Sequence, residues 1–152
     1  MLKRSFIGFL VLWLNLSSSW AETLPHAMNF QDDGKALNER QIILVLVSQN
    51  GCSYCEQITE QFLNPMYSGG LYQQKVLFRE LNMDQSDSIT DFDGLAISPR
   101  QFARRYQASL TPTLLFLGPS GQRLVSNLIG INTIEFYGYY LDQAIDQAIA
   151  LR

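Results

Sequence analysis

Hydrophobic and polar positions along the chain predict strands and helices that alternate over most of its length. Residues 42–47 read IILVLV, a continuous apolar run that is typical of a central strand covered on both faces. Further strands are predicted at residues 76–83, 114–117 and 123–129. Apolar side chains at helical spacing predict a short helix around residues 32–40, and longer helices at 53–64, 98–106 and 132–149.

Local signals predict where the helices begin and end. Ser98 and Gln101 have the spacing of a capping box at the start of the third helix. Asn132 and Glu135 have the same spacing before the last helix. Pro65 is expected to end the second helix, because the residue before a proline disfavours helical backbone angles.

The order of the elements predicts an α/β fold. A parallel strand–helix–strand unit comes first, and a tight turn at residues 118–121 joins the last two strands as an antiparallel hairpin. The expected architecture is a central mixed four-stranded sheet with helices on both faces, closed by the last helix. A length of 152 residues favours one domain, residues 22–152, in which residues 22–30 carry few signals and are expected to form a loose arm.

The first 21 residues have the character of a cleavable export signal. Two basic residues precede an apolar run at residues 6–16, and small residues occupy positions 19 and 21. We expect cleavage between Ala21 and Glu22, which directs the domain to the periplasm, an oxidising compartment. An uncleaved membrane anchor is the alternative, but the apolar run of about 11 residues is shorter than the roughly 20 that a spanning helix needs.

The charge left after cleavage restricts the class of partner. All 14 acidic residues and nine of the 11 basic residues follow the signal, so the net charge of residues 22–152 is −5. Nucleic acids and anionic membranes select basic patches, so neither is expected as a partner.

The motif that carries chemistry is the sequence GCSYC at residues 51–55, placed where a buried strand leads into a helix. The N-terminus of a helix presents free N–H groups and the positive end of the helix dipole. A thiolate there is stabilised, so its pKa falls below the usual value of about 8.5. We expect Cys52 to be the exposed nucleophile and Cys55, one turn further along, to be the shielded resolving thiol.

Two other interpretations of the cysteine pair remain open. A zinc site needs about four ligands, whereas the chain has two cysteines and a single histidine, His26, so no metal site is expected. A purely structural disulfide would close a very short loop and remove little entropy from the unfolded chain. A redox pair that follows a strand is the preferred interpretation.

A second motif is Leu110-Thr111-Pro112-Thr113, which leads directly into a predicted strand. Proline cannot donate a hydrogen bond to a neighbouring strand, so its place at the start of a strand is informative. The residues alone do not distinguish a cis from a trans bond before Pro112, and most such bonds are trans.

Together these motifs resemble the thioredoxin superfamily over about residues 36–151. The resemblance rests on residues 42–47, 52–55, 81–85 (LNMDQ), 111–113 (TPT) and 118–122 (GPSGQ). Within the superfamily the chain is most similar to small periplasmic thioredoxins of the SoxW-like kind. The features shared with them are the export signal, the sequence DFDG at residues 91–94 and an aromatic last helix.

The resemblance implies how a substrate would bind. The bond before Pro112 would be cis, and this proline would face the nucleophile. The backbone of Thr111 would then pair with an extended segment of the substrate, with Gly51, Ser53 and Tyr54 beside it. No cofactor is implied beyond the redox-active disulfide itself.

One departure from the family pattern concerns the proton acceptor. Thioredoxin has a buried Asp six residues before the first cysteine, where this chain has Leu46, and a buried Lys on the neighbouring strand, where this chain has Glu80. We therefore expect Glu80 to accept the proton of Cys55. An outward-facing Glu80 near Arg79 is the alternative.

The expected function is reduction of protein disulfides by an exported thiol–disulfide oxidoreductase. Its partners would be proteins that carry disulfides or thiols, with a membrane electron donor of the DsbD type to re-reduce the cysteine pair. We expect a monomer. The sequence has neither the large helical insertion of DsbA-type oxidases nor the added dimerisation domain of DsbC-type isomerases, which favours a reductant. A disulfide isomerase or oxidase of the same fold, a non-catalytic binding module and a peroxide-reducing enzyme remain alternatives.

Overall fold

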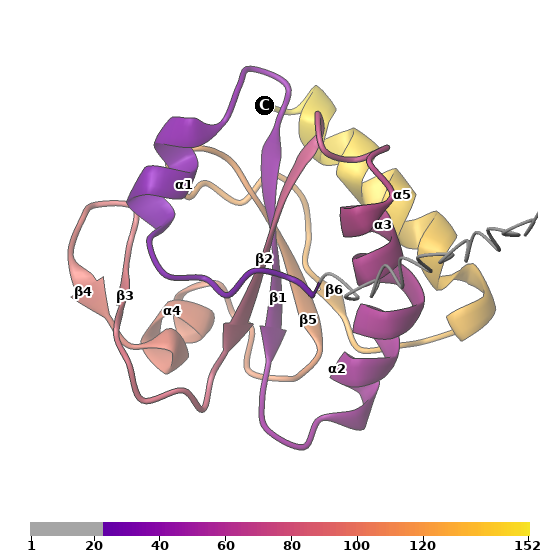
Figure 1. The fold of residues 1–152 in the computed structure, drawn as a ribbon, viewed down its shortest axis with the longest axis horizontal. Coiled ribbons are helices and arrows are strands. Elements are labelled where there is room, and N and C mark those ends of the chain that lie inside the picture. The colour runs from indigo at the N-terminus through magenta and orange to yellow at the C-terminus, as the bar shows by residue number, and fades with distance from the viewer. Residues whose placement is uncertain (1–22) are drawn as a thin grey trace, which may run out of the picture.

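The computed structural model describes residues 23–152 (Figure 1). The export signal predicted at residues 1–21 lies outside the described residues. No helix within residues 23–152 combines the length and apolar character that a membrane span requires.

A four-stranded mixed sheet forms the centre of the fold, with the strand order β2-β1-β5-β6. The strand β1 (Ile42–Ser48) pairs in parallel with β2 (Val76–Asn82) and antiparallel with β5 (Thr113–Leu117). The short β6 (Leu128–Ile129) extends the sheet beyond β5 as an antiparallel edge strand. Every residue of β1 is buried, as the continuous IILVLV run predicts. The predicted fold class is therefore confirmed.

Helices cover both faces of the sheet, so side chains of β1 alternate between two cores (Figure 1). One core contains Ile42, Leu44 and Leu46 of β1 and lies under α5 (Ile134–Ala150) and the helical segment that follows β1. The other core contains Ile43, Val45 and Val47 and lies under α1 (Phe30–Ala36) and α4 (Pro99–Arg105). This two-sided burial makes β1 a rigid support for whatever its C-terminal end carries.

The helical segment after β1 runs through Pro65, so the prediction that this proline ends the helix is wrong. The segment consists of α2 (Ser53–Ile58), the π-helical turn η1 (Thr59–Leu63) and α3 (Asn64–Ser68). In η1 the N–H of Asn64 donates to the carbonyl of Thr59, five residues earlier. Proline lacks an N–H and crowds the carbonyl four residues before it, and a wider turn removes that conflict. The helix therefore absorbs Pro65 through a local change of hydrogen bonding.

The segment before α1 is not the loose arm that the sequence predicts for residues 22–30. Leu24 and Ala27 are buried. The N–H of Glu80 in β2 donates to the carbonyl of Pro25 at 2.9 Å, and the N–H of Ala27 donates to the carbonyl of Glu80 at 2.8 Å. The segment thus lies parallel to β2 and covers the edge of the sheet, which would otherwise expose unpaired backbone groups.

The predicted helix starts and the shorter strands agree with the structure only in part. The capping box of Ser98 and Gln101 is present at the start of α4. The second predicted capping box is wrong, because Thr133 is the N-cap of α5 and makes no side-chain hydrogen bond there. The predicted strand at residues 123–129 is reduced to β6 and an isolated bridge between Arg123 and Leu117. A small two-stranded sheet, β3 (Ile89–Thr90) and β4 (Ala96–Ile97), forms in a segment predicted as loop.

Candidate active site

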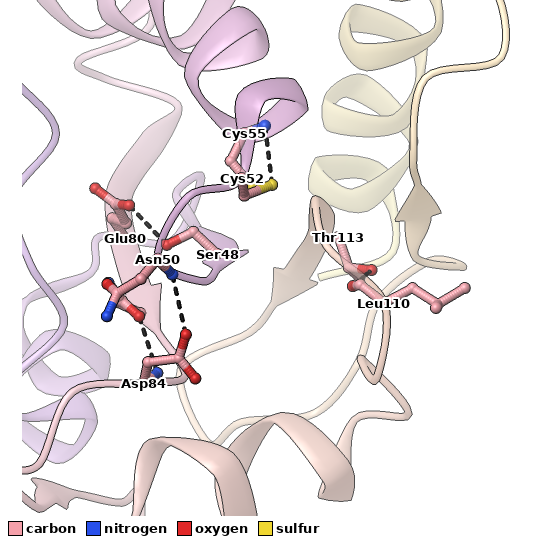
Figure 2. Close-up of a disulfide and its surroundings, with 9 residues drawn as sticks. Ser48, Asn50, Cys52, Cys55, Glu80, Asp84, Leu110 and Thr113 are labelled. Carbon is pink, nitrogen blue, oxygen red and sulfur yellow. Dashed lines mark hydrogen bonds between the residues drawn. A yellow bond between two sulfur atoms is a disulfide. The ribbon is translucent and has the colours of Figure 1, made fainter.

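The two cysteines lie where the buried strand β1 leads into α2 (Figure 2). Gly51 has a φ of +68°, in the left-handed region that glycine tolerates best. This turn lets the chain leave β1 and place Cys52 at the N-cap of α2, in an extended conformation. The exposed N–H groups of the helix start are therefore next to the Cys52 sulfur.

Cys52 and Cys55 form a disulfide, with 5.2 Å between their Cα atoms. The Sγ of Cys52 accepts a hydrogen bond of 3.1 Å from the backbone N–H of Cys55. When the disulfide is reduced, a thiolate on Cys52 in this position is stabilised by that N–H and by the positive end of the helix dipole. Cys52 is half-buried, whereas Cys55 is only 4% exposed. An attacking molecule can therefore approach Cys52 more easily than Cys55.

The loop that precedes β5 lies at the same end of the sheet as the cysteine loop. Val47, near the end of β1, pairs with Thr113, the first residue of β5. The bond between Thr111 and Pro112 is cis, as the family resemblance predicts. The loop is held by hydrogen bonds from the Thr113 hydroxyl to the Leu110 carbonyl at 2.7 Å, and from the Gly130 N–H to the Pro112 carbonyl at 2.8 Å.

Apolar side chains are exposed at this end of the sheet. Tyr54, within the cysteine motif, is 62% exposed, and Leu110 and Ile129 are exposed as well. Gly51 and Ser53, predicted to contact substrate together with Tyr54, are also exposed. Gly51, Ser53 and Tyr54 thus form an accessible surface around Cys52, and Leu110 and Ile129 add exposed apolar groups at the same end of the sheet.

Glu80 lies on the same face of the sheet as α2. Side chains of β2 alternate, and Glu80 shares its face with Phe78, which belongs to the core under α2 and α5. Glu80 is half-buried, and its Oε1 accepts a hydrogen bond of 2.7 Å from the hydroxyl of the buried Ser48 (Figure 2). Together with both cysteines, Ser48 and Glu80 line a cavity of about 370 Å³. Glu80 thus lies on the face of the sheet that carries α2 and lines the same cavity as the cysteine pair, and it does not share the face of Arg79.

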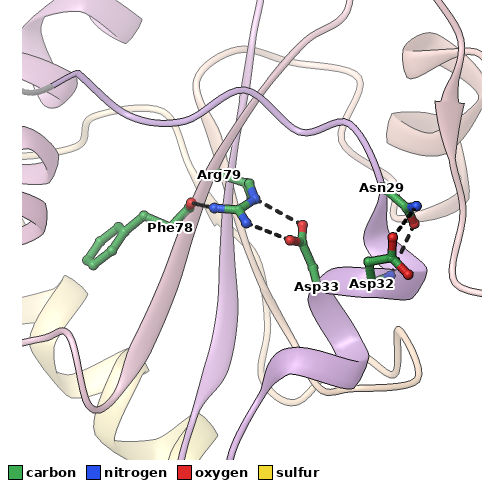
Figure 3. Close-up of polar contacts among 5 residues, drawn as sticks. All are labelled: Asn29, Asp32, Asp33, Phe78 and Arg79. Atoms are coloured by element: carbon green, nitrogen blue, oxygen red, sulfur yellow. Dashed lines mark hydrogen bonds and ion pairs between the residues drawn. The ribbon is translucent and has the colours of Figure 1, made fainter.

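Arg79, the neighbour of Glu80 in β2, points to the opposite face (Figure 3). Its guanidinium group donates two hydrogen bonds to the carboxylate of Asp33 in α1, at 2.9 and 2.5 Å, and a third to the Phe78 carbonyl at 2.8 Å. Arg79 therefore has its own partners and does not neutralise Glu80.

Sequence reasoning gave no role to three residues around the cysteine loop. They are Ser48, which hydrogen-bonds Glu80, and Asn50 and Asp84, which are hydrogen-bonded to each other at 3.0 Å. Asp84 belongs to the LNMDQ segment that carries part of the family resemblance, so the sequence marked its position without indicating its contact. Within residues 23–152 no group of three or more His, Cys, Asp and Glu residues is arranged to hold a metal ion.

Several solved structures share this fold. The DsbH oxidoreductase has a TM-score of 0.60 at 13% sequence identity, with 96% of each chain covered. Thioredoxin from Malassezia sympodialis has a TM-score of 0.56 at 15% identity, covering 87% of this chain and 98% of its own. Oxidised mitochondrial thioredoxin 3 from Saccharomyces cerevisiae has a TM-score of 0.54 at 16% identity, covering 81% and 93%. A search of curated proteins finds no match.

These structural similarities are distant and establish only the fold. A family model establishes the family. The model, described as a thioredoxin-like domain, matches residues 30–145. The matched range includes the cysteine motif, the cis-proline loop and all four strands of the central sheet. The chain belongs to the thioredoxin-like domain family, within the thioredoxin superfamily.

Proposed function

We propose that this protein is an exported thiol–disulfide oxidoreductase that reduces disulfides in partner proteins. The observation that carries the proposal is the Cys52–Cys55 disulfide at the start of α2, with Cys52 accessible and Cys55 buried directly behind it. This arrangement supplies one thiol that attacks and one that resolves, which is the requirement for disulfide exchange. The fold and the cysteine motif support thiol–disulfide chemistry in general. Export and the reducing direction are the parts that we add as a proposal.

The reaction begins with the reduced protein. The Cys52 thiolate attacks one sulfur of the substrate disulfide, which forms a mixed disulfide and releases the other substrate sulfur as a thiolate that takes up a proton. Cys55 then loses its proton and attacks the Sγ of Cys52, which releases the second substrate thiol. Two electrons pass to the substrate, and the protein ends in the disulfide form seen in the structure. A dithiol donor, for which we propose a membrane protein of the DsbD type, returns two electrons for the next cycle.

A substrate segment would bind beside the cis-proline loop. Thr111 is half-buried and lies two residues before β5, next to the cis-proline, and we propose that its backbone pairs with an incoming strand. Tyr54 and Leu110 are exposed, and we propose that they contact apolar side chains of the substrate. Backbone pairing tolerates many sequences, so we propose a broad range of protein substrates.

Glu80 is the proposed acceptor for the Cys55 proton. Both residues line one cavity, and the hydroxyl of Ser48 hydrogen-bonds the Glu80 carboxylate on that side of the sheet. The cavity is lined mainly by polar groups and is large enough for water, which could carry the proton over the remaining distance. A general base at this point speeds the resolving step, because Cys55 attacks only as a thiolate.

The test of the proposed function combines an insulin reduction assay with two single variants. Cys52→Ser is expected to abolish reduction, and Cys55→Ser is expected to accumulate mixed disulfides that a reducing agent releases. The double variant is the control and should trap nothing. A Cys55→Ser protein that captures no disulfide substrate, or a Cys52→Ser protein with normal reductase activity, would overturn the proposal.

The direction of electron transfer is tested separately. The reduction potential of the cysteine pair, measured in glutathione buffers, should lie near the thioredoxin end of the range of roughly −270 to −120 mV that such proteins span. A value near the upper end would instead support the oxidase or isomerase alternative. Export is tested by expressing the full chain in a Gram-negative host and sequencing the N-terminus of the periplasmic form, for which Glu22 is expected.

A further inference from the structure

The loop between β1 and α2 is held by two side chains at the C-terminal end of β2, those of Asn82 and Asp84. The backbone N–H of Asn50 donates to Oδ2 of Asp84 at 3.0 Å (Figure 2). The side-chain amide of Asn82 donates to Oδ1 of Asn50 at 2.8 Å. Asn50 is therefore fixed through both its backbone and its side chain, two residues before Cys52.

The groups that hold Asn50 are themselves fixed. The backbone N–H of Asp84 donates to Oδ1 of Asn82 at 2.9 Å, so the Asn82 side chain contacts both Asn50 and the backbone of Asp84. Arg100, in the first turn of α4, forms an ion pair with the other carboxylate oxygen of Asp84. Because α4 packs on the opposite face of the sheet from α2, Asp84 links the cysteine loop to a helix that makes no contact with the disulfide cavity (Figure 1).

The loop contains Gly51, the residue type with the fewest backbone restrictions, directly before Cys52. Gly51 has a φ of +68°, and the space where a Cβ would lie is open, so no side-chain packing at this position fixes the loop. The upstream end of the loop is anchored by the N–H of Met83, which donates to the Ser48 carbonyl at 2.9 Å. The Asp84 contact is the next anchor along the chain before Cys52.

We propose that Asp84 is a positioning residue for Cys52. Through Asn50 it holds the loop so that the Cys52 sulfur stays at the N–H groups of the α2 N-terminus, where its thiolate is stabilised. Asn82 and Arg100 keep Asp84 in place for this task. The inference rests on the proposed function, because it takes Cys52 as the attacking thiol. It concerns how the loop positions Cys52 and makes no statement about the substrate.

The test compares variants of Asp84 by two measurements in a Cys55→Ser background, where only Cys52 can react. Asp84→Ala is expected to make amide hydrogen exchange at Asn50 about tenfold faster, because one hydrogen bond is lost. It should also raise the midpoint of the pH profile of Cys52 alkylation by about half a unit, because the thiolate leaves the helix start for part of the time. Asp84→Asn, which keeps an acceptor oxygen, should remain closer to the unsubstituted protein in both measurements.

Two further variants keep the test decisive. Asp87→Ala removes an exposed carboxylate three residues away, whose side chain accepts a hydrogen bond from Ser86, and should change neither measurement. Asn82→Ala removes the donor to the Asn50 side chain without changing charge, and should shift both measurements in the same direction as Asp84→Ala. If Asp84→Ala is too unstable to study, the Asn82 variant decides the question by the same criteria.

Two results would overturn the proposal. One is that Asp84→Ala has the same Asn50 exchange rate and the same Cys52 alkylation profile as the Asp87→Ala control. The other is an equal shift of the profile in Asp84→Asn and Asp84→Ala with unchanged protection of Asn50, which would assign the effect to charge. Both measurements remain possible if the protein fails to reduce insulin, so failure of the proposed function is distinguishable from failure of this inference.

Discussion

Arg79 and Glu80 are consecutive residues of β2 that carry opposite charges to opposite faces of the sheet. Arg79 is satisfied by a charged partner, because it forms a two-point ion pair with Asp33 in which the exposed fractions of the two side chains are 19% and 11%. Glu80 receives a neutral hydrogen bond from Ser48 and opens into a cavity beside the disulfide. One charge is thus held by a counter-charge, whereas the other has a neutral partner and faces the cavity beside the disulfide.

The difference indicates how the same strand serves stability and chemistry. A charge that is paired on two points and partly removed from water is costly to separate from its partner. A carboxylate with one neutral donor and access to a cavity can gain and lose a proton without breaking an ion pair. Substitutions at Asp33 should therefore affect unfolding, and substitutions at Glu80 should affect the exchange reaction.

The largest effect on stability is expected from Asp33→Ala. It leaves the Arg79 guanidinium group without its anion in a site that is mostly shielded from water, so the free energy of unfolding should fall by about 3 kcal/mol. Urea unfolding measures this loss. Insulin reduction per folded molecule should stay unchanged, because Asp33 lies on the face away from the cysteine pair.

Asp32→Ala is the matched control for this substitution. Asp32 is the adjacent residue of α1, but its side chain is 68% exposed and contacts Asn29 and Lys35 at the surface (Figure 3). Its loss should lower the free energy of unfolding by no more than about 1 kcal/mol. Equal losses in the two variants would mean that burial of the Asp33–Arg79 pair has no energetic consequence.

Glu80→Gln is expected to slow the resolving step about 100-fold, a change of about 2.7 kcal/mol in activation free energy. Glutamine keeps the shape and accepts the Ser48 hydrogen bond but cannot take the proton of Cys55. Stopped-flow decay of a preformed mixed disulfide on Cys52 measures this step directly. The loss should be greatest at neutral pH and smaller at alkaline pH, where hydroxide removes the proton. A pH profile identical to that of the unsubstituted protein would remove Glu80 from the mechanism.

The fold was predictable because its main signals are local in the sequence. The IILVLV run of β1 requires cover on both faces, and the Ser98–Gln101 pair forms its capping box from residues three apart. The position of Cys52 at a helix start follows in the same way, since a buried strand and an amphipathic helix flank it. These features depend on neighbours along the chain.

Two of the missed features depend on partners far away in the sequence. Leu24 and Ala27 are apolar positions too few to predict a strand, and only the free edge of β2 makes their pairing favourable. The turn that accommodates Pro65 is an exception, because it is a local change of hydrogen bonding that the proline signal alone does not predict. Ser48 and Glu80 are 32 positions apart, so their hydrogen bond exists only once β1 and β2 are paired.

Ser48→Ala should have an intermediate effect. Ser48 is buried, and its hydroxyl is the donor to Glu80, so the substitution should lower the free energy of unfolding by about 1 kcal/mol. Glu80 would lose its orientation in the cavity but keep its ability to accept a proton. The resolving step should therefore slow only a few-fold, less than in Glu80→Gln. Ser48→Thr, which retains the hydroxyl, should recover most of the rate. If Ser48→Ala resolves the mixed disulfide as slowly as Glu80→Gln does, the hydroxyl itself carries the proton.

The smallest effect is expected from Lys75→Ala, which tests whether exposure decides the worth of an ion pair in this protein. Lys75 lies 3.3 Å from Asp146 in α5, and the exposed fractions of the two side chains are 48% and 69%. Water and salt screen such a pair, so the free energy of unfolding should fall by about 0.3 kcal/mol, and the difference should disappear at 1 M NaCl. Urea unfolding at low and high salt measures both values. A loss as large as that of Asp33→Ala would mean that the burial of Arg79 is not the reason for its importance, and that the contrast between the two faces of β2 rests on geometry alone.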